Sequence, residues 1–227
     1  MSDIIFYPVA LIAALAIVAA AALPGRDRLA CSSVSGAGTD YRTIQVSGDD
    51  LCRFEASGEA EIELVRSGEQ ITHLTITASS GSLGDRPDRN PHFRLAADLE
   101  RVFAGHEVRV TIEARPSLDA GASAFEANYS AGFEGNSGWS LFELRADYAP
   151  YSFTWDVPQR TAEEIAVDYL AIRPVIPEKT RSVDVRSVKF ELLERTQVAP
   201  EAIPQPIPGI APETPEDSQP ETTQTDP

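Results

Sequence analysis

One short segment of the sequence combines an aromatic side chain with charged side chains at a spacing that suits ligand binding. Residues 139–148 fit the period of a strand, which places every second side chain on one face. Trp139, Glu143 and Arg145 then share a face. Aromatic rings stack on the C–H surfaces of sugars, while neighbouring polar groups bind the hydroxyls. We predict a ligand-binding set of Trp139, Glu143, Arg145 and Tyr148, with packing at the rim of the domain as the alternative for Trp139.

The loop from residue 84 to residue 92 carries a second group of candidate side chains. Asp85 and Asp88 lie in it with an asparagine and a histidine, and calcium prefers oxygen ligands of the kind that these acids supply. The spacing matches no EF-hand loop, and Arg86 and Arg89 lie among the acids. Two interpretations stay open: a structural calcium site, and a solvated loop with local Asp–Arg pairs.

The sequence contains no motif that indicates catalysis. Residues 135–138 read Gly-Asn-Ser-Gly and break the Gly-x-Ser-x-Gly pattern of a nucleophile elbow. His73, His92 and His106 lack the spacing of a zinc-binding HExxH motif, and no phosphate-binding loop is present. A glycosidase pair of carboxylates is defined in space rather than by spacing in sequence. We therefore predict no catalysis and no cofactor other than structural calcium, with a glycan-processing enzyme as the weakest alternative.

The two cysteines of the chain, Cys31 and Cys52, both lie near the start of the folded part. A small, even number of cysteines is compatible with one disulfide in an oxidising compartment. We predict a disulfide between Cys31 and Cys52, and two unrelated buried thiols are the alternative.

The candidate residues lie in a region whose sequence pattern predicts β-structure. From residue 41 to residue 193 the apolar side chains alternate with a period of two, and turn signals separate the runs. The expected strands are 42–46, 51–55, 60–65, 71–78, 93–99, 107–114, 124–130, 139–148, 151–157, 167–173 and 183–193. Strands at this short spacing in one domain predict an all-β fold, an antiparallel β-sandwich of jelly-roll type.

Segments in the second half of this region resemble those of a known superfamily in their order and spacing. They are Val108–Arg115, Phe125–Tyr129, Gly138–Phe142, Tyr151–Pro158, Tyr169–Pro174 and Val183–Leu192. The first is similar to the strand that opens many carbohydrate-binding-module jelly rolls, and the last is similar to the closing strand of that family. Residues 108–193 thus resemble the galactose-binding-like jelly-roll superfamily. The resemblance implies the fold, whereas sugar binding is an expectation that a likeness of fold does not establish.

The resemblance also adds one residue to the calcium candidates. Asp184, in the last expected strand, occupies a position where related modules often have an aspartate near a structural metal. The predicted calcium set is then Asp85, Asp88 and Asp184. Arg181 and Arg186 are close enough in sequence to pair with Asp184 instead.

The longest apolar run of the chain lies at its N-terminal end. Residues 4–23 contain no charge, and about 20 apolar residues in a helix span the ~30 Å hydrocarbon core of a bilayer. A cleaved signal peptide is the alternative, although residues 1–3 contain no lysine or arginine. A lipoprotein signal is excluded because Arg28 lies just before Cys31. We predict a retained single-pass transmembrane helix within residues 1–25.

Two sets of observations disagree about the side of the membrane that holds the rest of the chain. Arg26 and Arg28 follow the apolar run, and the positive-inside rule then places the bulk of the chain in the cytoplasm. The pair of cysteines, the resemblance to carbohydrate-binding modules and the acidic Pro-rich tail are typical of proteins outside it. We predict the inner membrane, with the soluble domain on the periplasmic side.

The formal net charge is −16, and residues 201–227 carry six acids and no base. Nucleic acid is excluded as a partner because binding it needs a basic face. We predict four parts: a membrane anchor (1–25), a stalk (26–40), a β-sandwich (41–194) and a disordered acidic Pro-rich tail (195–227).

The predicted function is that of a membrane-anchored, extracytoplasmic module that recognises carbohydrate or an envelope protein. It would bind its partner through its surface and would not catalyse a reaction. An accessory or scaffold subunit of a membrane protein assembly is the alternative from a different class.

Overall fold

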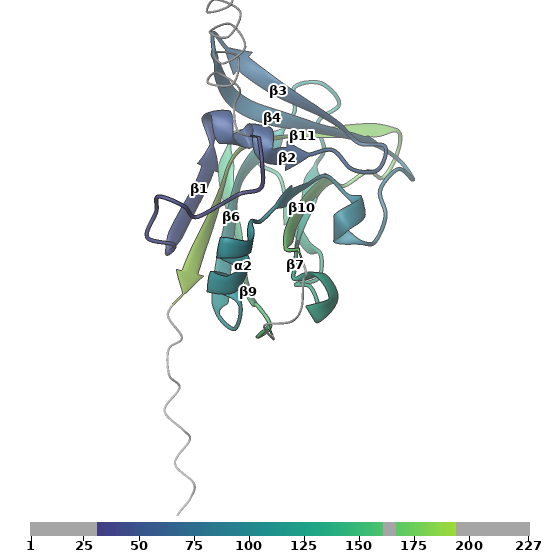
Figure 1. Ribbon diagram of the computed structural model, residues 1–227. Coiled ribbons are helices and arrows are strands. Elements are labelled where there is room, and N and C mark those ends of the chain that lie inside the picture. Colours follow the sequence, from purple (N-terminus) through teal and green to yellow (C-terminus); the bar gives the residue numbers. More distant parts are fainter. Residues whose placement is uncertain (1–30, 161–166, 194–227) are drawn as a thin grey trace, which may run out of the picture. The chain divides into compact units, whose positions relative to one another are not determined.

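The computed structural model describes residues 31–160 and 167–193, which form two β-sheets with short helices between some of the strands (Figure 1). In chain order the elements are β1 (Thr43–Ser47), η1 (Gly48–Arg53), β2 (Phe54–Glu55), β3 (Glu61–Ser67), β4 (Gln70–Ser79), η2 (Pro87–Arg89), β5 (His92–Arg94), α2 (Ala97–Phe103), β6 (Glu107–Pro116), β7 (Ala124–Ser130), η3 (Gly132–Glu134), β8 (Ser140–Glu143), β9 (Ala149–Asp156), β10 (Tyr169–Pro174) and β11 (Thr180–Leu193). Elements labelled η are single 3₁₀ turns or pairs of them.

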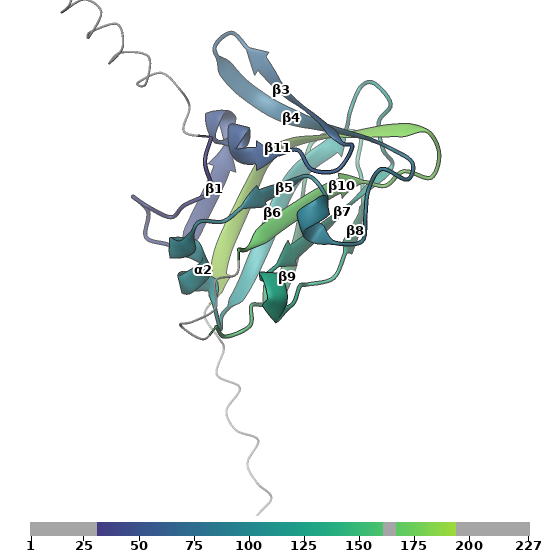
Figure 2. The ribbon, with the colours of Figure 1, turned by 45° about the vertical axis from the view of Figure 1, so that its right-hand side comes forward.

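The larger sheet has the strand order β3-β4-β11-β6-β9, and β1 joins it by pairing with β11. The smaller sheet has the order β2-β5-β10-β7-β8 (Figure 2). All pairings between these strands are antiparallel. β11 has 14 residues and pairs with three strands, β4, β1 and β6. The long last strand therefore lies inside the larger sheet.

The two sheets enclose one hydrophobic core because their strands alternate buried and exposed side chains. In β4, Leu74 and Ile76 are fully buried, while the threonines beside them lie on the outer face. Phe125 of β7 and Leu170 of β10 enter the same core from the smaller sheet. For the described residues, the predicted all-β antiparallel sandwich is confirmed.

Three expected strands are corrected by the structure. In the run 51–55 only β2, Phe54–Glu55, is a strand, because residues 51–53 belong to η1, and in the run 139–148 the strand β8 covers only Ser140–Glu143. The run 93–99 was expected to be a strand, but β5 ends at Arg94 and a helix, α2, begins at Ala97. Leu99 and Phe103 are four residues apart, lie on one face of this helix and are both fully buried. The burial of this pair explains the helix, which is too short to show a helical period in the sequence.

The described part of the predicted stalk, residues 31–40, packs against the sandwich, so the stalk prediction is corrected there. Val34 is buried, and its N–H donates to the carbonyl of Arg94 at 2.7 Å. The Ala96 N–H in turn donates to the Val34 carbonyl at 2.7 Å. Cys31 and Cys52 form a disulfide, with Cα atoms 5.2 Å apart. The domain therefore begins before the boundary expected at residue 41.

Within residues 31–160 and 167–193, no helix is both long enough and apolar enough to cross a membrane. The predicted anchor, residues 1–25, and the predicted tail, residues 195–227, lie outside the described residues.

Candidate functional site

The outer face of the smaller sheet carries the side chains that matter for binding. Along β10, Leu170 and Ile172 point into the core, so Tyr169, Ala171 and Arg173 belong to the other face. The loop that joins β4 to β5, residues 80–91, covers part of this face and contains η2. Contacts between that loop and the sheet shape a pocket.

Asn90 fixes the shape of the loop. Its side chain is fully buried, and Nδ2 donates to the carbonyl oxygens of Gly84 at 2.9 Å and of Arg86 at 2.6 Å. The Arg173 guanidinium donates to the same Gly84 carbonyl at 2.7 Å. These bonds tie the residues before η2 to the sheet and so build one wall of the pocket.

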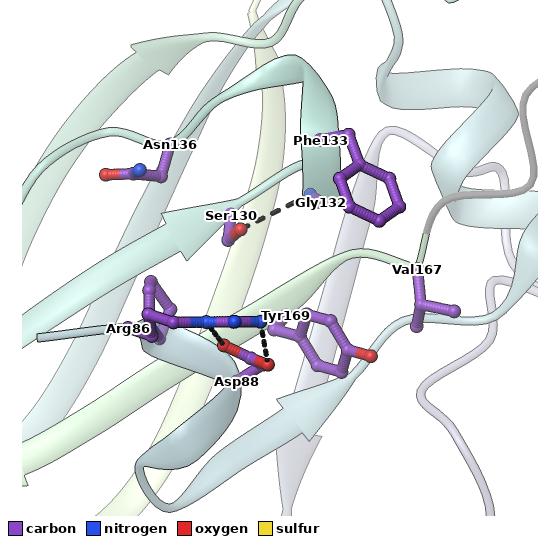
Figure 3. A pocket seen from close by; sticks show the side chains of 9 residues that line it. Arg86, Asp88, Ser130, Gly132, Phe133, Asn136, Val167 and Tyr169 are labelled. Atoms are coloured by element: carbon purple, nitrogen blue, oxygen red, sulfur yellow. Dashed lines mark hydrogen bonds and ion pairs between the residues drawn. The ribbon is translucent and has the colours of Figure 1, made fainter. Parts of the chain in front are cut away.

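The pocket has a volume of about 550 Å³, within the usual range for small-molecule sites. Its lining comes from η2, the end of β7, η3 and the start of β10, which lie far apart in the sequence. Figure 3 shows η3 with Phe133 on one side and Arg86 with Asp88 on the other. The lining residues are Arg86, Pro87, Asp88, Ser130, Gly132, Phe133, Asn136, Val167 and Tyr169.

Two aromatic rings line this pocket. Phe133 belongs to η3 and is 97% exposed, more than any other large apolar side chain among the described residues. Tyr169 at the start of β10 is half-buried and lies edge-on to His92, with ring centroids 4.8 Å apart. An apolar ring gains no stability from exposure to water. A bound ligand, in contrast, can cover the Phe133 ring. Tyr169, held by His92, offers a second and more rigid surface.

Hydrogen-bonding groups surround the rings. Arg86 and Asp88 form a two-pronged pair, Nε to Oδ1 at 3.0 Å and Nη2 to Oδ2 at 2.7 Å. The side-chain oxygen of Asn136, Oδ1, accepts from Asn128 Nδ2 at 3.1 Å and from the Gly138 N–H at 2.9 Å. Asn136 therefore has its Nδ2 group to offer to a ligand. The pocket combines apolar ring surface with fixed donors and acceptors.

A buried charge network lies directly behind the pocket lining. Asp168 is fully buried and accepts from the Tyr129 hydroxyl at 2.8 Å. Its other oxygen is bound by Arg160, which also pairs with Glu100 of α2 at 3.3 Å. Burial raises the pKa of Asp168 to about 6, against the opposing effects of the Tyr129 hydrogen bond and the Arg160 charge.

The structure does not bring the four residues of the predicted ligand-binding set together. The ring of Trp139 is half-buried, with Nε1 donating to the Asp85 carbonyl at 3.0 Å and the Arg173 guanidinium 3.8 Å above the ring. Glu143 and Arg145 are exposed. The Trp139 ring thus packs against the loop and the sheet. Trp139, Glu143 and Arg145 do not line the pocket.

Tyr148, the fourth residue of the predicted set, lies against the larger sheet instead. Arg186 of β11 and Arg115 of β6 lie over its ring, 3.9 Å and 4.6 Å from the centroid. Burial raises the pKa of Tyr148, and the nearby Asp184 charge acts in the same direction. Trp139 and Tyr148 therefore contact different sheets.

The sequence reasoning missed Phe133, the most exposed aromatic of the pocket. Its only sequence signal is a bulky apolar residue in the segment Gly132-Phe133-Glu134-Gly135, which falls outside the alternating pattern. Turn glycines on both sides predict a loop, and a large apolar side chain in a short loop has little core to enter. This signal marks an exposed ring without indicating which pocket it borders.

The three aspartates of the predicted calcium set do not form one site, because Asp85 and Asp88 lie in the β4–β5 loop and Asp184 lies in β11. Asp85 is exposed, and Asp88 is bound by Arg86, as the alternative interpretation of this loop expected. Asp184 lies on the outer face of the larger sheet, where Arg115 pairs with it at 3.1 Å and the Thr75 hydroxyl donates to it at 2.9 Å. Across the described ranges, no three His, Cys, Asp or Glu residues form a group that could hold a metal ion.

Comparison with known proteins finds no matching family model and no matching curated protein. Solved structures do match, and carbohydrate-binding modules, the class that the sequence resembles, are among them. One is a family 22 module with the catalytic module of xylanase 10B from Clostridium thermocellum, complexed with xylohexaose, at 12% identity and a TM-score of 0.43. The match covers 61% of this chain and 25% of that one.

Two further matches are xylan-binding modules. The family 22 domain of Paenibacillus barcinonensis Xyn10C is 10% identical over 62% of this chain and 86% of that one, with a TM-score of 0.40. A family 15 module is 14% identical over 67% of this chain and 97% of that one, also with a TM-score of 0.40. At these identities and TM-scores, the ligands of those proteins say nothing about the ligand of this chain.

Proposed function

We propose that this chain is a carbohydrate-binding module that binds a sugar, without catalysis, in the pocket between η2 and η3. The observation that carries the proposal is the Phe133 ring, 97% exposed at a pocket whose lining also contains the polar side chains of Arg86, Asp88, Ser130 and Asn136. A pyranose has an apolar C–H face and a rim of hydroxyls, so a ring beside fixed donors and acceptors complements both parts.

The polar lining suits neutral hydroxyls. Arg86 and Asp88 neutralise each other, and each keeps lone pairs or N–H groups beyond their shared bonds. The Ser130 hydroxyl accepts from the Gly132 N–H at 3.3 Å, which leaves its own hydrogen for a ligand oxygen. With no net charge from the Arg86–Asp88 pair, the pocket favours a neutral sugar over a charged one.

The described lining residues do not include the pair of carboxylates on which most glycosidases depend. Asp88 is the only acid among the described lining residues, and Arg86 binds both of its oxygens. Both common glycosidase mechanisms need a second carboxyl group, about 5–9.5 Å from the first. We therefore propose recognition rather than hydrolysis.

The test compares Phe133→Ala with a matched control. Covering about 60 Å² of apolar ring surface at about 25 cal/mol per Å² is worth about 1.5 kcal/mol, or roughly tenfold in affinity. Leu118 is also exposed, at 87%, but does not line the pocket, so Leu118→Ala removes a similar surface elsewhere. The assay is calorimetric titration of the full chain in mild detergent with cellohexaose and xylohexaose, after a glycan array screen.

We expect Phe133→Ala to weaken binding about tenfold and Leu118→Ala to leave it unchanged. Equal affinities for the two variants would place the ligand away from this pocket. No binding to any glycan on the array would refute carbohydrate recognition itself.

We also propose that residues 1–25 hold this module at the inner membrane, with the domain on the periplasmic side. The uncharged run 4–23 supports the anchor, and the Cys31–Cys52 disulfide supports an oxidising compartment. The test fuses alkaline phosphatase or green fluorescent protein to the C-terminus. Phosphatase activity without fluorescence is expected, and the reverse result would place the domain in the cytoplasm.

The alternative of a scaffold subunit predicts a different result. A scaffold has a stoichiometric membrane protein partner that co-purifies from mild detergent, whereas a sugar-binding module does not require one. Co-purification of such a partner, together with a silent glycan array, would replace the carbohydrate proposal with the scaffold.

A further inference from the structure

Trp139 lies directly before β8, and two contacts fix its indole ring on the outer face of the smaller sheet. Its Nε1 donates to the carbonyl of Asp85 at 3.0 Å, and the Arg173 guanidinium lies 3.8 Å from the ring centroid. Glu126 of β7 binds that guanidinium at 2.8 Å. The indole is therefore held in one orientation before a ligand arrives, so a ligand that stacks on it loses little affinity to ordering of the side chain.

Arg173 stacks on one face of the indole and leaves part of the ring exposed, because the Trp139 side chain is only half-buried. In the described part of the smaller sheet β8 is the outermost strand, so no described strand lies beyond Trp139. Leu141, two residues further along the same face, is 62% exposed. The exposed part of the Trp139 ring and the Leu141 side chain form an apolar surface, which we call the Trp139 platform.

The Trp139 platform and the pocket share two short chain segments. Asp85, which binds the indole, directly precedes Arg86 of the pocket lining. Gly138, directly before Trp139, donates its N–H to Oδ1 of Asn136 at 2.9 Å, and Asn136 also lines the pocket. The three residue steps from Asn136 to Trp139 span at most about 10 Å of backbone. A ligand of a few sugar units can therefore reach both.

Polar side chains lie beside the Trp139 platform. Glu126 is the register partner of Leu141 across β7 and β8, so the neutral Arg173–Glu126 pair borders the platform. The exposed Asp85 and Glu143 offer carboxylate oxygens, which accept hydrogen bonds from hydroxyl groups. An aromatic ring beside such groups suits the apolar face and the hydroxyl rim of a pyranose.

We propose that the Trp139 platform is a second sugar subsite and that the ligand is a neutral linear oligosaccharide. One part of the oligosaccharide fills the pocket beside Phe133, and a further unit stacks on the exposed part of the Trp139 ring. This inference rests on the proposed carbohydrate binding in the pocket, and it adds a dependence on chain length. A short sugar uses the pocket alone, whereas a longer one gains the second contact.

The second contact sets the size of this dependence. Covering about 60 Å² of apolar surface at about 25 cal/mol per Å² corresponds to roughly tenfold in affinity. We expect cellohexaose and xylohexaose to bind about tenfold more tightly than cellobiose and xylobiose, because a disaccharide in the pocket has no further unit to place on the ring.

Four variants assign the contacts in calorimetric titrations of the full chain in mild detergent with these four sugars. Phe133→Ala should weaken binding of all four about tenfold, whereas Trp139→Ala should weaken only the two hexaoses, also about tenfold. Trp139→Phe keeps a ring but loses the bond from Nε1 to Asp85, so it should keep most of the hexaose affinity. Tyr148→Ala is the matched control, because Arg186 also stacks on that ring, at 3.9 Å, but the ring lies against the larger sheet. It should change none of the four affinities.

A second measurement reports on the ring itself. The chain has two tryptophans, and the second, Trp155, packs against the core with its ring 5.2 Å from that of Tyr129. In NMR spectra of the indole N–H groups, the Trp139 signal should shift as a hexaose binds while the Trp155 signal stays fixed. Disaccharides should leave both signals in place.

Equal hexaose affinities for the wild type and Trp139→Ala would overturn the second subsite and leave the pocket as proposed. Equal losses for disaccharides and hexaoses in both Trp139 variants would also overturn it, since Trp139 would then act by holding the loop at Asp85. Weaker hexaose binding in Trp139→Ala with none in Phe133→Ala would instead refute the proposed function of the pocket and keep the platform. If the wild type bound none of the four sugars, both proposals would fall.

Discussion

Replacing Asp168 by asparagine should change how the stability of the domain depends on pH. The carboxyl is fully buried, and asparagine has the same shape without a titratable proton. Its amide oxygen can still accept from the Tyr129 hydroxyl, and Arg160 keeps its pair with Glu100 at 3.3 Å. The variant therefore resembles the protonated acid, and the folded structure should survive the change.

The magnitude follows from the raised pKa. Burial moves the pKa of Asp168 from 3.8 to about 6, so the folded state binds this proton more tightly than the unfolded state does. The stabilising effect of the proton is complete below pH 3.8 and is lost as the pH rises through 6. At about 1.4 kcal/mol for each pKa unit, the complete loss is about 3 kcal/mol, and most of it, about 2 kcal/mol, falls between pH 4 and pH 7.

Urea unfolding at pH 4, 5, 6 and 7 measures this difference. The free energy of unfolding of the wild type, minus that of Asp168→Asn, should fall by about 2 kcal/mol from pH 4 to pH 7. Other titrating groups are common to both proteins and cancel in the subtraction. Parallel pH dependences for the two proteins would show that Asp168 titrates normally, and the reasoning about the buried network would then be refuted.

The structure makes three further predictions about stability. Asn90→Ala removes two buried hydrogen bonds to loop carbonyls and should lower the free energy of unfolding by about 2 kcal/mol in urea, with sugar binding weakened in parallel. Reducing the Cys31–Cys52 disulfide, which closes a 21-residue separation, should cost about 3 kcal/mol, seen as a lower Tm in dithiothreitol. Burial acts to raise the pKa of Asp98, but hydrogen bonds from the Ser35 hydroxyl and from backbone N–H groups lower it overall. The stability that the ionised Asp98 carboxylate contributes should therefore be lost on acidification below pH 4, and Asp98→Asn should lack it. An unchanged Tm after reduction, or an Asp98→Asn protein with the wild-type acid transition, would contradict these assignments.

Most strands could be predicted because the apolar residues that each strand buries alternate within its own sequence. In β6, β7 and β11, alternate residues enter the core, and the sequence pattern shows this without any knowledge of the partner strand. The helix α2 could not be found in this way, because Leu99 and Phe103 form only one turn of pattern. The role of residues 31–40 was missed for a related reason, since Val34 is a single apolar residue in a segment rich in small ones.

The binding pocket depends on contacts that no local pattern encodes. Arg86, Phe133 and Tyr169 come together only because β10 pairs with β7 and the β4–β5 loop folds over both. Periodicity placed Trp139 on the correct face of its strand, yet it could not show that Arg173 would stack on the ring from β10. Alternation indicates which way a side chain points, and the tertiary structure decides what covers it.

The place of β11 in the larger sheet has a consequence for synthesis of the chain. Among the described strands β11 comes last in sequence, but β4 and β6 both pair with it, and β1 pairs with its second half. Until residue 193 has been made, these three earlier strands lack the neighbour that joins them. The larger sheet therefore cannot be completed progressively from the N-terminus, and pairings of large sequence separation such as these slow folding. A nascent chain that stops short of Thr180 exposes three unpaired strand edges, which makes truncated products prone to aggregation.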